Sequence, residues 1–279
     1  MRLGGGIQKP YNDPESWIAL VKELGYSAAT SPVNSDATKE EIAAYCDIAK
    51  QNDVIIAEVG AWSNPMAQCE EERKKAMEYI KKQLALAEEM GANCCVNISG
   101  SRGDIWDGCY HDNYSKDTYD LIVESVREII DAVKPVRTFY TLEPMPWMYP
   151  SSPDEYLQMI KDIDRTAFAV HLDYANMING VERYINLSDF IKHCYKVLGP
   201  HIKSVHAKDV IIVHNRLPCN INEVAPGKGI VDYGLVLKLT QELGDDTPLI
   251  TEHIHTHEEY VEAAAYIRKI GEQQGINIK

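Results

Sequence analysis

Four residues that can act as metal ligands or as acid–base groups lie at the ends of short apolar segments. They occur in the runs TLEPMPW, VHLDYAN, SVHAKD and LITEHIH, as Glu143, Asp173, His206 and Glu252. Any one carboxylate could cap a helix or pair with a lysine, but all four groups gathered in a water-poor site would repel one another and lose hydration. A divalent cation removes this conflict. Carboxylate-rich ligation with one histidine favours Mn2+ or Mg2+, with Co2+ or Zn2+ as alternatives.

These ligands can meet only if the segments before them are neighbouring parallel strands. Apolar, β-branched runs predict eight strands, at residues 2–7, 26–31, 53–59, 94–99, 138–143, 167–173, 203–209 and 248–253. Helical periodicity and capping signals predict helices between them, near residues 13–25, 38–50, 70–90, 117–134, 152–163, 187–198 and 233–243, with a last helix after Thr256.

Eight strands alternating with helices in 279 residues predict a (β/α)8 TIM barrel, for which about 250 residues is typical. A doubly wound sheet is the alternative, but LGGGIQKPYNDP after the first strand lacks the GxGxxG spacing of a phosphate-binding turn. No linker or low-complexity tract divides the chain, so we expect one barrel domain over residues 1–279. In such barrels the active site lies at the carboxyl ends of the strands.

The composition excludes several classes of partner. The formal net charge of -14 opposes binding to nucleic acid or to an anionic membrane surface. No stretch approaches the roughly 20 apolar residues of a membrane helix, and the amino terminus lacks the apolar region of a secretory signal. The seven cysteines form no CxxC pair and suggest no disulfide framework. We therefore expect a cytoplasmic protein.

Side chains near the four ligands supply candidates for catalysis. Alternation along a strand places Lys208 on the same inward column as His206, beyond it towards the barrel mouth, where an ammonium could steady an enolate oxygen or move a proton. The same alternation places His171 one layer below Asp173, as a supporting or core histidine. His255 follows the last strand and is a candidate acid or base by location, although a solvated loop histidine is the alternative.

Residues on the loops after the strands are candidates for substrate binding. Trp62, Trp106 and Trp147 follow the third, fourth and fifth strands and could offer flat faces to sugar C–H groups or to an aromatic ring, or could pack the loops. The polar stretch 100–116 is expected to form a lid or interface arm that contributes Arg102 and His111.

The sequence resembles the xylose isomerase-like barrels, which include sugar isomerases, ketose 3-epimerases, hydroxypyruvate isomerase and inosose dehydratase. The resemblance rests on the placement of the four ligands, on HAKD at 206–209 and on PGKGIVDY at 226–233. It implies a metal that holds two adjacent oxygens of a hydroxy-ketone and stabilises an enediolate, with Glu143, Glu252 and Lys208 among the groups that move protons.

One departure from the family pattern bears on the reaction. Ketose 3-epimerases pair the glutamate of the fifth strand with a second acid and the aspartate of the sixth with a histidine, but Tyr149 and Asn176 occupy those places here and are expected to contact substrate. Family members that eliminate water or an aglycone are therefore an alternative. These include inosose dehydratases and the catalytic subunits of C-glycoside deglycosidases, which cleave 3-keto glycosides and work with a small second subunit.

The resemblance thus implies a metal-dependent enzyme of carbohydrates or hydroxy-ketones, foremost an isomerase or epimerase, with a lyase and a non-catalytic sugar-binding barrel as alternatives. The DNA-repair endonucleases of the same fold require more histidine ligands and a basic surface. We expect a small sugar or keto-glycoside as ligand, and a homo-oligomer, with a small second subunit as an alternative. Whether the substrate carries phosphate is open, since Gly227 and Gly229 could either cradle one or approach the helix cap at Asp232.

Overall fold

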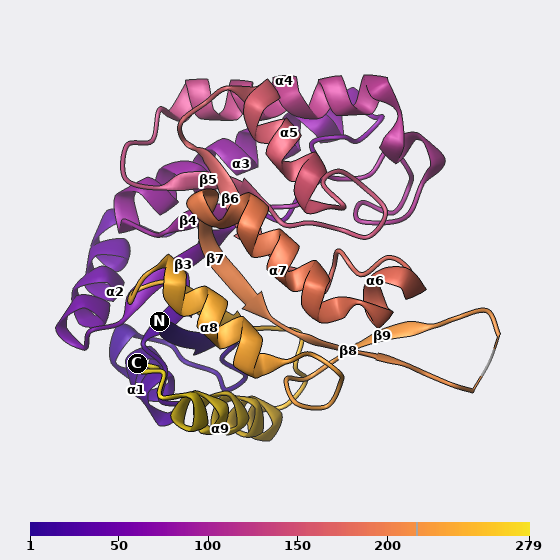
Figure 1. Ribbon diagram of the computed structural model, residues 1–279. Helices are drawn as coiled ribbons and strands as arrows, with labels where there is room; N and C mark the ends of the chain where they lie inside the picture. Colours follow the sequence, from indigo (N-terminus) through magenta and orange to yellow (C-terminus); the bar gives the residue numbers. More distant parts are fainter. Residues whose placement is uncertain (216) are drawn as a thin grey trace.

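The computed structural model describes residues 1–215 and 217–279. Eight parallel strands form a nearly closed barrel (Figure 1), in the order β1-β10-β7-β6-β5-β4-β3-β2. They are β1 (Arg2–Gly5), β2 (Ala28–Thr30), β3 (Ile55–Gly60), β4 (Cys94–Asn97), β5 (Phe139–Leu142), β6 (Phe168–Leu172), β7 (Ile202–Ala207) and β10 (Pro248–Thr251). At the seam between β1 and β2, the amide of Ser27 donates to the carbonyl of Leu3 at 3.0 Å. The predicted barrel is confirmed, and each predicted strand segment overlaps one of these strands.

Helices surround the barrel and follow the strands in turn (Figure 1). They are α1 (Pro14–Glu23), α2 (Lys39–Gln51), α3 (Glu70–Met90), α4 (Lys116–Val133), α5 (Pro153–Ile163), α6 (Val181–Ile185), α7 (Leu187–Leu198), α8 (Tyr233–Leu243) and α9 (His257–Gln274), with two 3-10 turns, η1 (His111–Tyr114) and η2 (Gly199–His201). Capping boxes of Thr38 with Glu41 and of Thr256 with Glu259 begin α2 and α9. None of the described helices has the length and apolar character needed to cross a membrane.

Buried tyrosines fix the strand ends from which the candidate site is built. The Tyr156 hydroxyl, from α5, donates to the carbonyl of Leu142 at 2.7 Å, one residue before Glu143. The hydroxyls of Tyr174 and Tyr233 both donate to the carbonyl of Lys208, at 3.0 and 3.1 Å. Because the three tyrosines are buried, these hydrogen bonds connect the strand ends to the core around the barrel.

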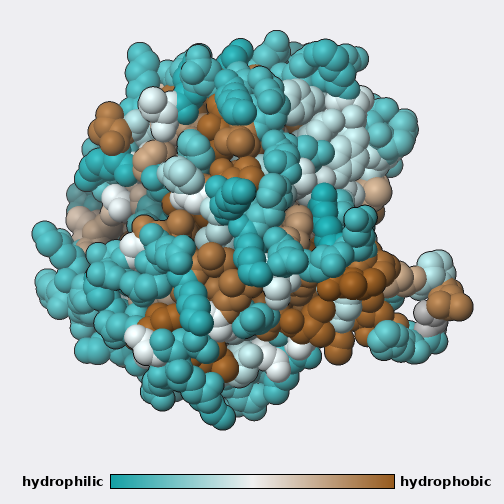
Figure 2. Space-filling view, viewed as in Figure 1, coloured by the Kyte–Doolittle hydropathy of each residue, from teal (hydrophilic) through white to brown (hydrophobic). Residues whose placement is uncertain are grey.

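An antiparallel hairpin that the sequence patterns did not predict follows β7. It consists of β8 (Asp209–Ile212) and β9 (Ile221–Val224) and projects from the barrel (Figure 1). Figure 2 shows apolar residues gathered along the base of this hairpin. Nearby exposed apolar residues include Ile185 on α6 and Leu217 at the hairpin tip, which is 97% exposed. The predicted seventh strand, 203–209, is therefore corrected, because β7 ends at Ala207 and Asp209 begins the hairpin.

The glycine run after the hairpin encloses a carboxylate of the chain itself. The amides of Gly227, Gly229 and Val231 donate to the buried carboxylate of Asp209 at 2.9 to 3.0 Å, as does the amide of Val210. A methyl group on Gly229 would lie 2.2 Å from this carboxylate. Because Asp209 uses these donors, the run holds the base of the hairpin, and Gly227 and Gly229 are not free to cradle a phosphate.

Candidate metal centre

The four candidate ligands meet at the carboxyl ends of neighbouring strands. Glu143 follows β5, Asp173 follows β6, His206 lies on β7 and Glu252 follows β10. One ligand-type atom from each lies within 4.8 Å of the others. His206 Nδ1 lies 2.8 Å from Glu252 Oε2 and 3.3 Å from both Asp173 Oδ2 and Glu143 Oε1. The structure therefore brings all four together.

Lys208 enters the same cluster. Its side chain is fully buried, and Nζ lies 2.7 Å from Asp173 Oδ2, 2.8 Å from Glu252 Oε2 and 3.4 Å from Glu143 Oε1. Lys208 shares the inward column of His206, as strand alternation predicts, but its ammonium lies among the carboxylates. The cluster thus contains three acids, one imidazole and one ammonium.

The electrostatics of the cluster follow from burial and from this mixture of charges. Burial alone would lower the pKa of Lys208 and of His206, but the surrounding carboxylates raise both well above their usual values. Burial would raise the pKa of Asp173, but Lys208 and His206 hold it well below its usual value. Burial raises the pKa of Glu143, an effect that Lys208 opposes. Glu143 is therefore the carboxylate most ready to accept a proton.

The donor set fits a divalent cation. Glu252 Oε2 is buried and accepts no hydrogen bond of good geometry from the described residues, although His206 Nδ1 and Lys208 Nζ each lie 2.8 Å from it. A divalent ion together with the Lys208 ammonium would balance the negative charge of the three carboxylates. His206 would then be neutral, which is the form in which imidazole binds a metal. Mainly oxygen donors with one nitrogen suit Mn2+ or Mg2+.

A second polar layer lies beneath the ligands. His206 Nε2 is 3.4 Å from Glu58 Oε2, and Glu58 also accepts a hydrogen bond from the Ser204 hydroxyl. The ring of His171 packs edge-on against that of His206, with centroids 4.0 Å apart, and burial lowers the pKa of His171 to about 4. Glu58 therefore orients the ligand imidazole, and His171 is a neutral supporting ring, as its parity predicts.

Asn176 connects two of the candidate ligands. Its side-chain amide donates to Glu143 Oε1 at 2.9 Å, and its backbone amide donates to Asp173 Oδ1 at 2.9 Å. Asn176 was expected to contact substrate. The structure places it where it holds both carboxylates in orientation and also lines the cavity above them.

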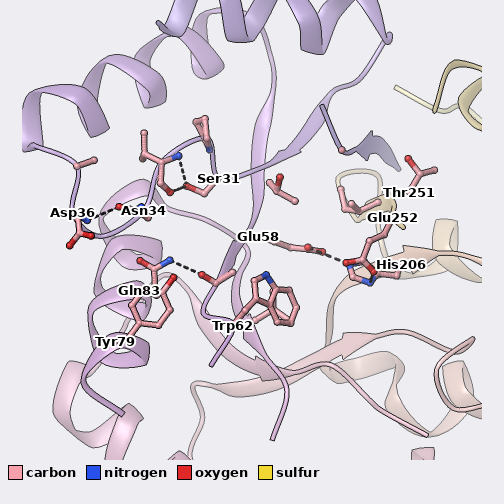
Figure 3. Close-up of a pocket in the computed structure, with 18 of the residues that line it drawn as sticks. Ser31, Asn34, Asp36, Glu58, Trp62, Tyr79, Gln83, His206, Thr251 and Glu252 are labelled. Carbon is pink, nitrogen blue, oxygen red and sulfur yellow. Dashed lines mark hydrogen bonds and ion pairs between the residues drawn. The ribbon is translucent and has the colours of Figure 1, made fainter. Parts of the chain in front are cut away.

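Two cavities open from the cluster into the barrel mouth. The polar cavity, of about 690 Å3, is bounded by the loop after β2, by α3 and by the ends of β3 and β10. Figure 3 shows Asn34 and Asp36 of that loop across this space from Glu58 and His206, with Trp62 below Glu58 in this view. The aromatic cavity, of about 550 Å3, is lined by apolar residues and by Trp62, Trp106 and Trp147. All three tryptophans thus lie at the mouth, where the sequence places them.

Four other expected site residues lie elsewhere. The guanidinium of Arg102 donates to the Met66 carbonyl at 2.8 Å, beside a separate surface cavity. His111 is exposed and pairs with the neighbouring Asp112. Tyr149 packs edge-on against Tyr114 and Tyr119, and His255 lies on a cavity formed by the glycine run and α9.

These placements correct the expected roles, because loop direction is not fixed by strand alternation. Arg102, His111 and Tyr149 do not reach the cavities as substrate contacts. His255 does not reach them as an acid or base. The histidine that the structure places at the aromatic cavity is His253.

The whole-chain comparison agrees with the geometry. The sequence model of the xylose isomerase-like TIM barrel family matches residues 18–270. The chain belongs to this family. A curated relative, the uncharacterized protein YihM of Escherichia coli (strain K12), is 29% identical over 99 residues, which are 36% of this chain. The match covers only 28% of that relative's length.

Solved structures share the fold at low sequence identity. D-psicose 3-epimerase of Clostridium cellulolyticum H10, solved with D-tagatose, has a TM-score of 0.72 and 16% identity, covering 99% of this chain and 100% of its own. The probable 3-DHS dehydratase AsbF of Bacillus anthracis has a TM-score of 0.71 and 14% identity over 95% of this chain and 97% of its own. A xylose isomerase-like TIM barrel protein of Mycobacterium smegmatis in complex with magnesium has a TM-score of 0.69 and 17% identity, covering 96% of each chain.

Two carboxylates near the candidate metal centre were not predicted from the sequence. Glu58 lies within the apolar strand IIAEVG, and a carboxylate inside such a strand is a signal that could have identified it. Glu223, on β9, lies 3.8 Å from Lys208 Nζ, and its carboxylate is 3.1 Å from His253 Nδ1. Glu223 gave no signal because only the unpredicted hairpin brings it to the site.

Proposed function

We propose that this protein is a divalent-metal-dependent enzyme that moves a proton next to the carbonyl of a carbohydrate or hydroxy-ketone, foremost as an isomerase or epimerase. The observation that carries the proposal is the convergence of four ligand-type atoms, from Glu143, Asp173, His206 and Glu252, within 4.8 Å of one another. The cavities on either side give a substrate access to this point. Sugar epimerases among the proteins of the same fold support this reaction class.

The ligand residues would hold Mn2+ or a similar ion, which supplies Lewis acidity toward a carbonyl oxygen. The chain's own groups then handle protons and charge. Glu143, whose pKa burial raises, is the proposed base, and Lys208 the proposed group that stabilises the oxygen made negative by proton removal or returns a proton to it. Asn176 orients Glu143 through its 2.9 Å hydrogen bond.

A lyase is the second candidate function. It is favoured by the position of Tyr149, whose hydroxyl donates to the Tyr114 carbonyl and so does not provide a second acid–base group at the cluster. Elimination of water or of an aglycone from a keto sugar requires one base beside the carbonyl, whereas epimerisation requires proton delivery to two faces of one carbon. A dehydratase among the solved structures of this fold agrees with that candidate.

Two measurements test the proposal. Elemental analysis of protein purified without chelator should find one divalent ion per chain. Incubation with keto-sugars and keto-glycosides in D2O with Mn2+ should incorporate deuterium next to the carbonyl, read together with isomer formation and aglycone release. Glu143→Gln and Asp173→Asn should lower metal occupancy and activity, whereas the exposed control Glu262→Gln should not.

Two results would contradict the proposal. Full occupancy and full activity in both ligand variants would show that the site is assigned wrongly. Bound metal without deuterium exchange into any keto-sugar would favour the non-catalytic sugar-binding barrel.

A further inference from the structure

The two cavities adjoin at the metal-ligand cluster and share part of their lining. Trp62 and Glu252 line both of them, His206 lines the polar cavity and Glu143 lines the aromatic cavity. A substrate whose reacting carbon lies at the cluster can therefore extend in two directions. Each cavity, at about 690 and 550 Å3, falls within the roughly 300–1,000 Å3 range of sites for drug-sized ligands.

The polar cavity suits a hydroxylated ring without negative charge. Asp36, Glu41 and Glu58 contribute carboxylates to its wall, and the loop after β2 adds Ser31 and Asn34 (Figure 3). Carboxylate and amide oxygens accept hydrogen bonds from hydroxyl groups. The same wall opposes a phosphate or a carboxylate, because like charges at short range are unfavourable.

Among the described residues that line the two cavities, neither cavity has a lysine or an arginine. The histidine that lines each cavity already faces a carboxylate of the cluster or of the hairpin. Lys208 is buried below and already paired with Asp173 and Glu252. The glycine run that resembles an anion site is occupied by Asp209. The wall chemistry therefore favours a substrate without phosphate.

The aromatic cavity suits a flat or bulky apolar group. Trp62, Trp106 and Trp147 have exposed fractions of 42%, 40% and 37%, so much of each large side chain remains open to a ligand. Trp147 Nε1 donates to the Asp107 carbonyl at 2.7 Å. The indole of Trp62 packs against Gly60, so closely that a methyl group added to this glycine would lie 2.5 Å from Trp62 Nε1. Rings fixed in this way lose little freedom on binding a ligand.

We propose that the substrate is a neutral molecule of two chemically different halves, a hydroxylated ring in the polar cavity and an aromatic or bulky apolar substituent in the aromatic cavity. This inference rests on the proposed function in one respect: the reacting carbon of the substrate is placed at Glu252, between the two cavities. Trp62 contacts both halves, and Trp106 and Trp147 determine specificity for the apolar half. A glycoside with an aromatic aglycone has this composition.

Binding measurements on the intact, metal-supplemented protein test this inference. The probes are phenyl β-D-glucopyranoside, methyl β-D-glucopyranoside and glucose 6-phosphate, titrated calorimetrically. Phenyl glucoside should bind about tenfold more tightly than methyl glucoside, since aromatic stacking and apolar burial contribute on the order of 1.4 kcal/mol. Glucose 6-phosphate should bind more weakly than methyl glucoside.

Variants separate the two cavities. Trp106→Ala and Trp147→Ala should remove most of the phenyl advantage and leave methyl glucoside affinity unchanged, whereas Trp106→Phe should keep most of it. Asp36→Ala should weaken both glucosides by the same factor. Melting temperatures close to wild type are expected for all four variants, because these side chains are partly exposed. If Trp147→Ala instead loses much stability and still binds phenyl glucoside more tightly than methyl glucoside, this ring packs the loop and does not contact the ligand.

Several results would overturn the inference. These are equal affinity for the two glucosides, tighter binding of the phosphate, no binding of phenyl glucoside at millimolar concentration, or tryptophan variants that weaken both glucosides equally. Deuterium exchange distinguishes this failure from that of the proposed function. If deuterium exchanges into keto-sugars but phenyl glucoside binds no more tightly than methyl glucoside, only the proposal of a two-part substrate is rejected. If phenyl glucoside binds more tightly but no exchange occurs, only the proposed reaction is rejected.

Discussion

The ammonium of Lys208 lies 2.7 Å from Asp173 Oδ2 in a cluster where both side chains are fully buried. Removing one member of a buried ion pair costs about 3–5 kcal/mol, because the remaining charge is left without a partner. Lys208 therefore has two roles that can be measured apart: it neutralises the carboxylates, and it is the proposed group that handles the proton.

For the first role we predict a loss of stability that metal reverses. In the presence of a chelator, Lys208→Met should lower Tm by several degrees, because about 3 kcal/mol or more of pairing is lost. Added Mn2+ should recover much of this loss, since a divalent ion replaces the missing positive charge. Thermal unfolding with chelator and with Mn2+ measures both effects, with the exposed Lys192→Met as control. An unchanged Tm in chelator would contradict the pairing.

For the second role we predict a loss of activity. Lys208→Ala should reduce kcat by about 100-fold or more, the usual contribution of a positioned acid–base group. Tyr149→Phe should have little effect, because the Tyr149 hydroxyl is bonded to the Tyr114 carbonyl away from the cluster. Steady-state kinetics on the substrate found by the deuterium screen makes this comparison. Equal losses in the two variants would reject the assignment to Lys208.

Asn176 should act on metal affinity through Glu143, to which its side-chain amide donates. Removing the hydrogen bonds that orient metal ligands lowers metal affinity by about 10–100-fold. We predict a loss of this size in Asn176→Ala, measured by competition with a chromogenic chelator. Asn179→Ala is the matched control, since its side-chain amide donates only to the Pro146 carbonyl, at 3.4 Å and on the exposed surface. Affinity unchanged in Asn176→Ala would show that this side-chain hydrogen bond does not hold Glu143 in orientation.

Asp209 should contribute more to stability than an ordinary helix cap. Its carboxylate accepts four backbone hydrogen bonds, and each buried donor left without an acceptor costs about 1–3 kcal/mol. Asp209→Ala should therefore destabilise the protein by at least about 3 kcal/mol, against about 1 kcal/mol for the helix cap variant Asp232→Ala. Urea unfolding gives both values. A similar cost in the two variants would mean that the glycine run rearranges freely.

The strand pattern predicted that the four candidate metal ligands converge, because parallel strands of a barrel present their carboxyl ends at one face. Glu143, Asp173, His206 and Glu252 follow from that rule alone, and alternation along β6 and β7 also placed His171 and Lys208. The hairpin could not be predicted in this way, because it forms by pairing of two short segments within a loop. Tyr149 was assigned from the family pattern and His255 from its place after the last strand, but the direction of a loop depends on its packing, here against Tyr114 and against α9.

The last prediction concerns epimerisation of free ketoses at C3. Epimerisation requires proton delivery to both faces of one carbon, usually from two opposed groups. Ketose 3-epimerases have a second acid and a histidine at two positions that hold Tyr149 and Asn176 in this chain. Tyr149 lies away from the cluster, and Asn176 donates to Glu143 and carries no titrating proton. We therefore expect no rapid conversion of fructose or tagatose at C3 with Mn2+, measured by chromatography against their epimers. Rapid conversion would contradict a site with a single base. Glu223 would then be the candidate second base, because its carboxylate lines the aromatic cavity and pairs with His253. In that case Glu223→Gln should abolish epimerisation while leaving bound metal in place.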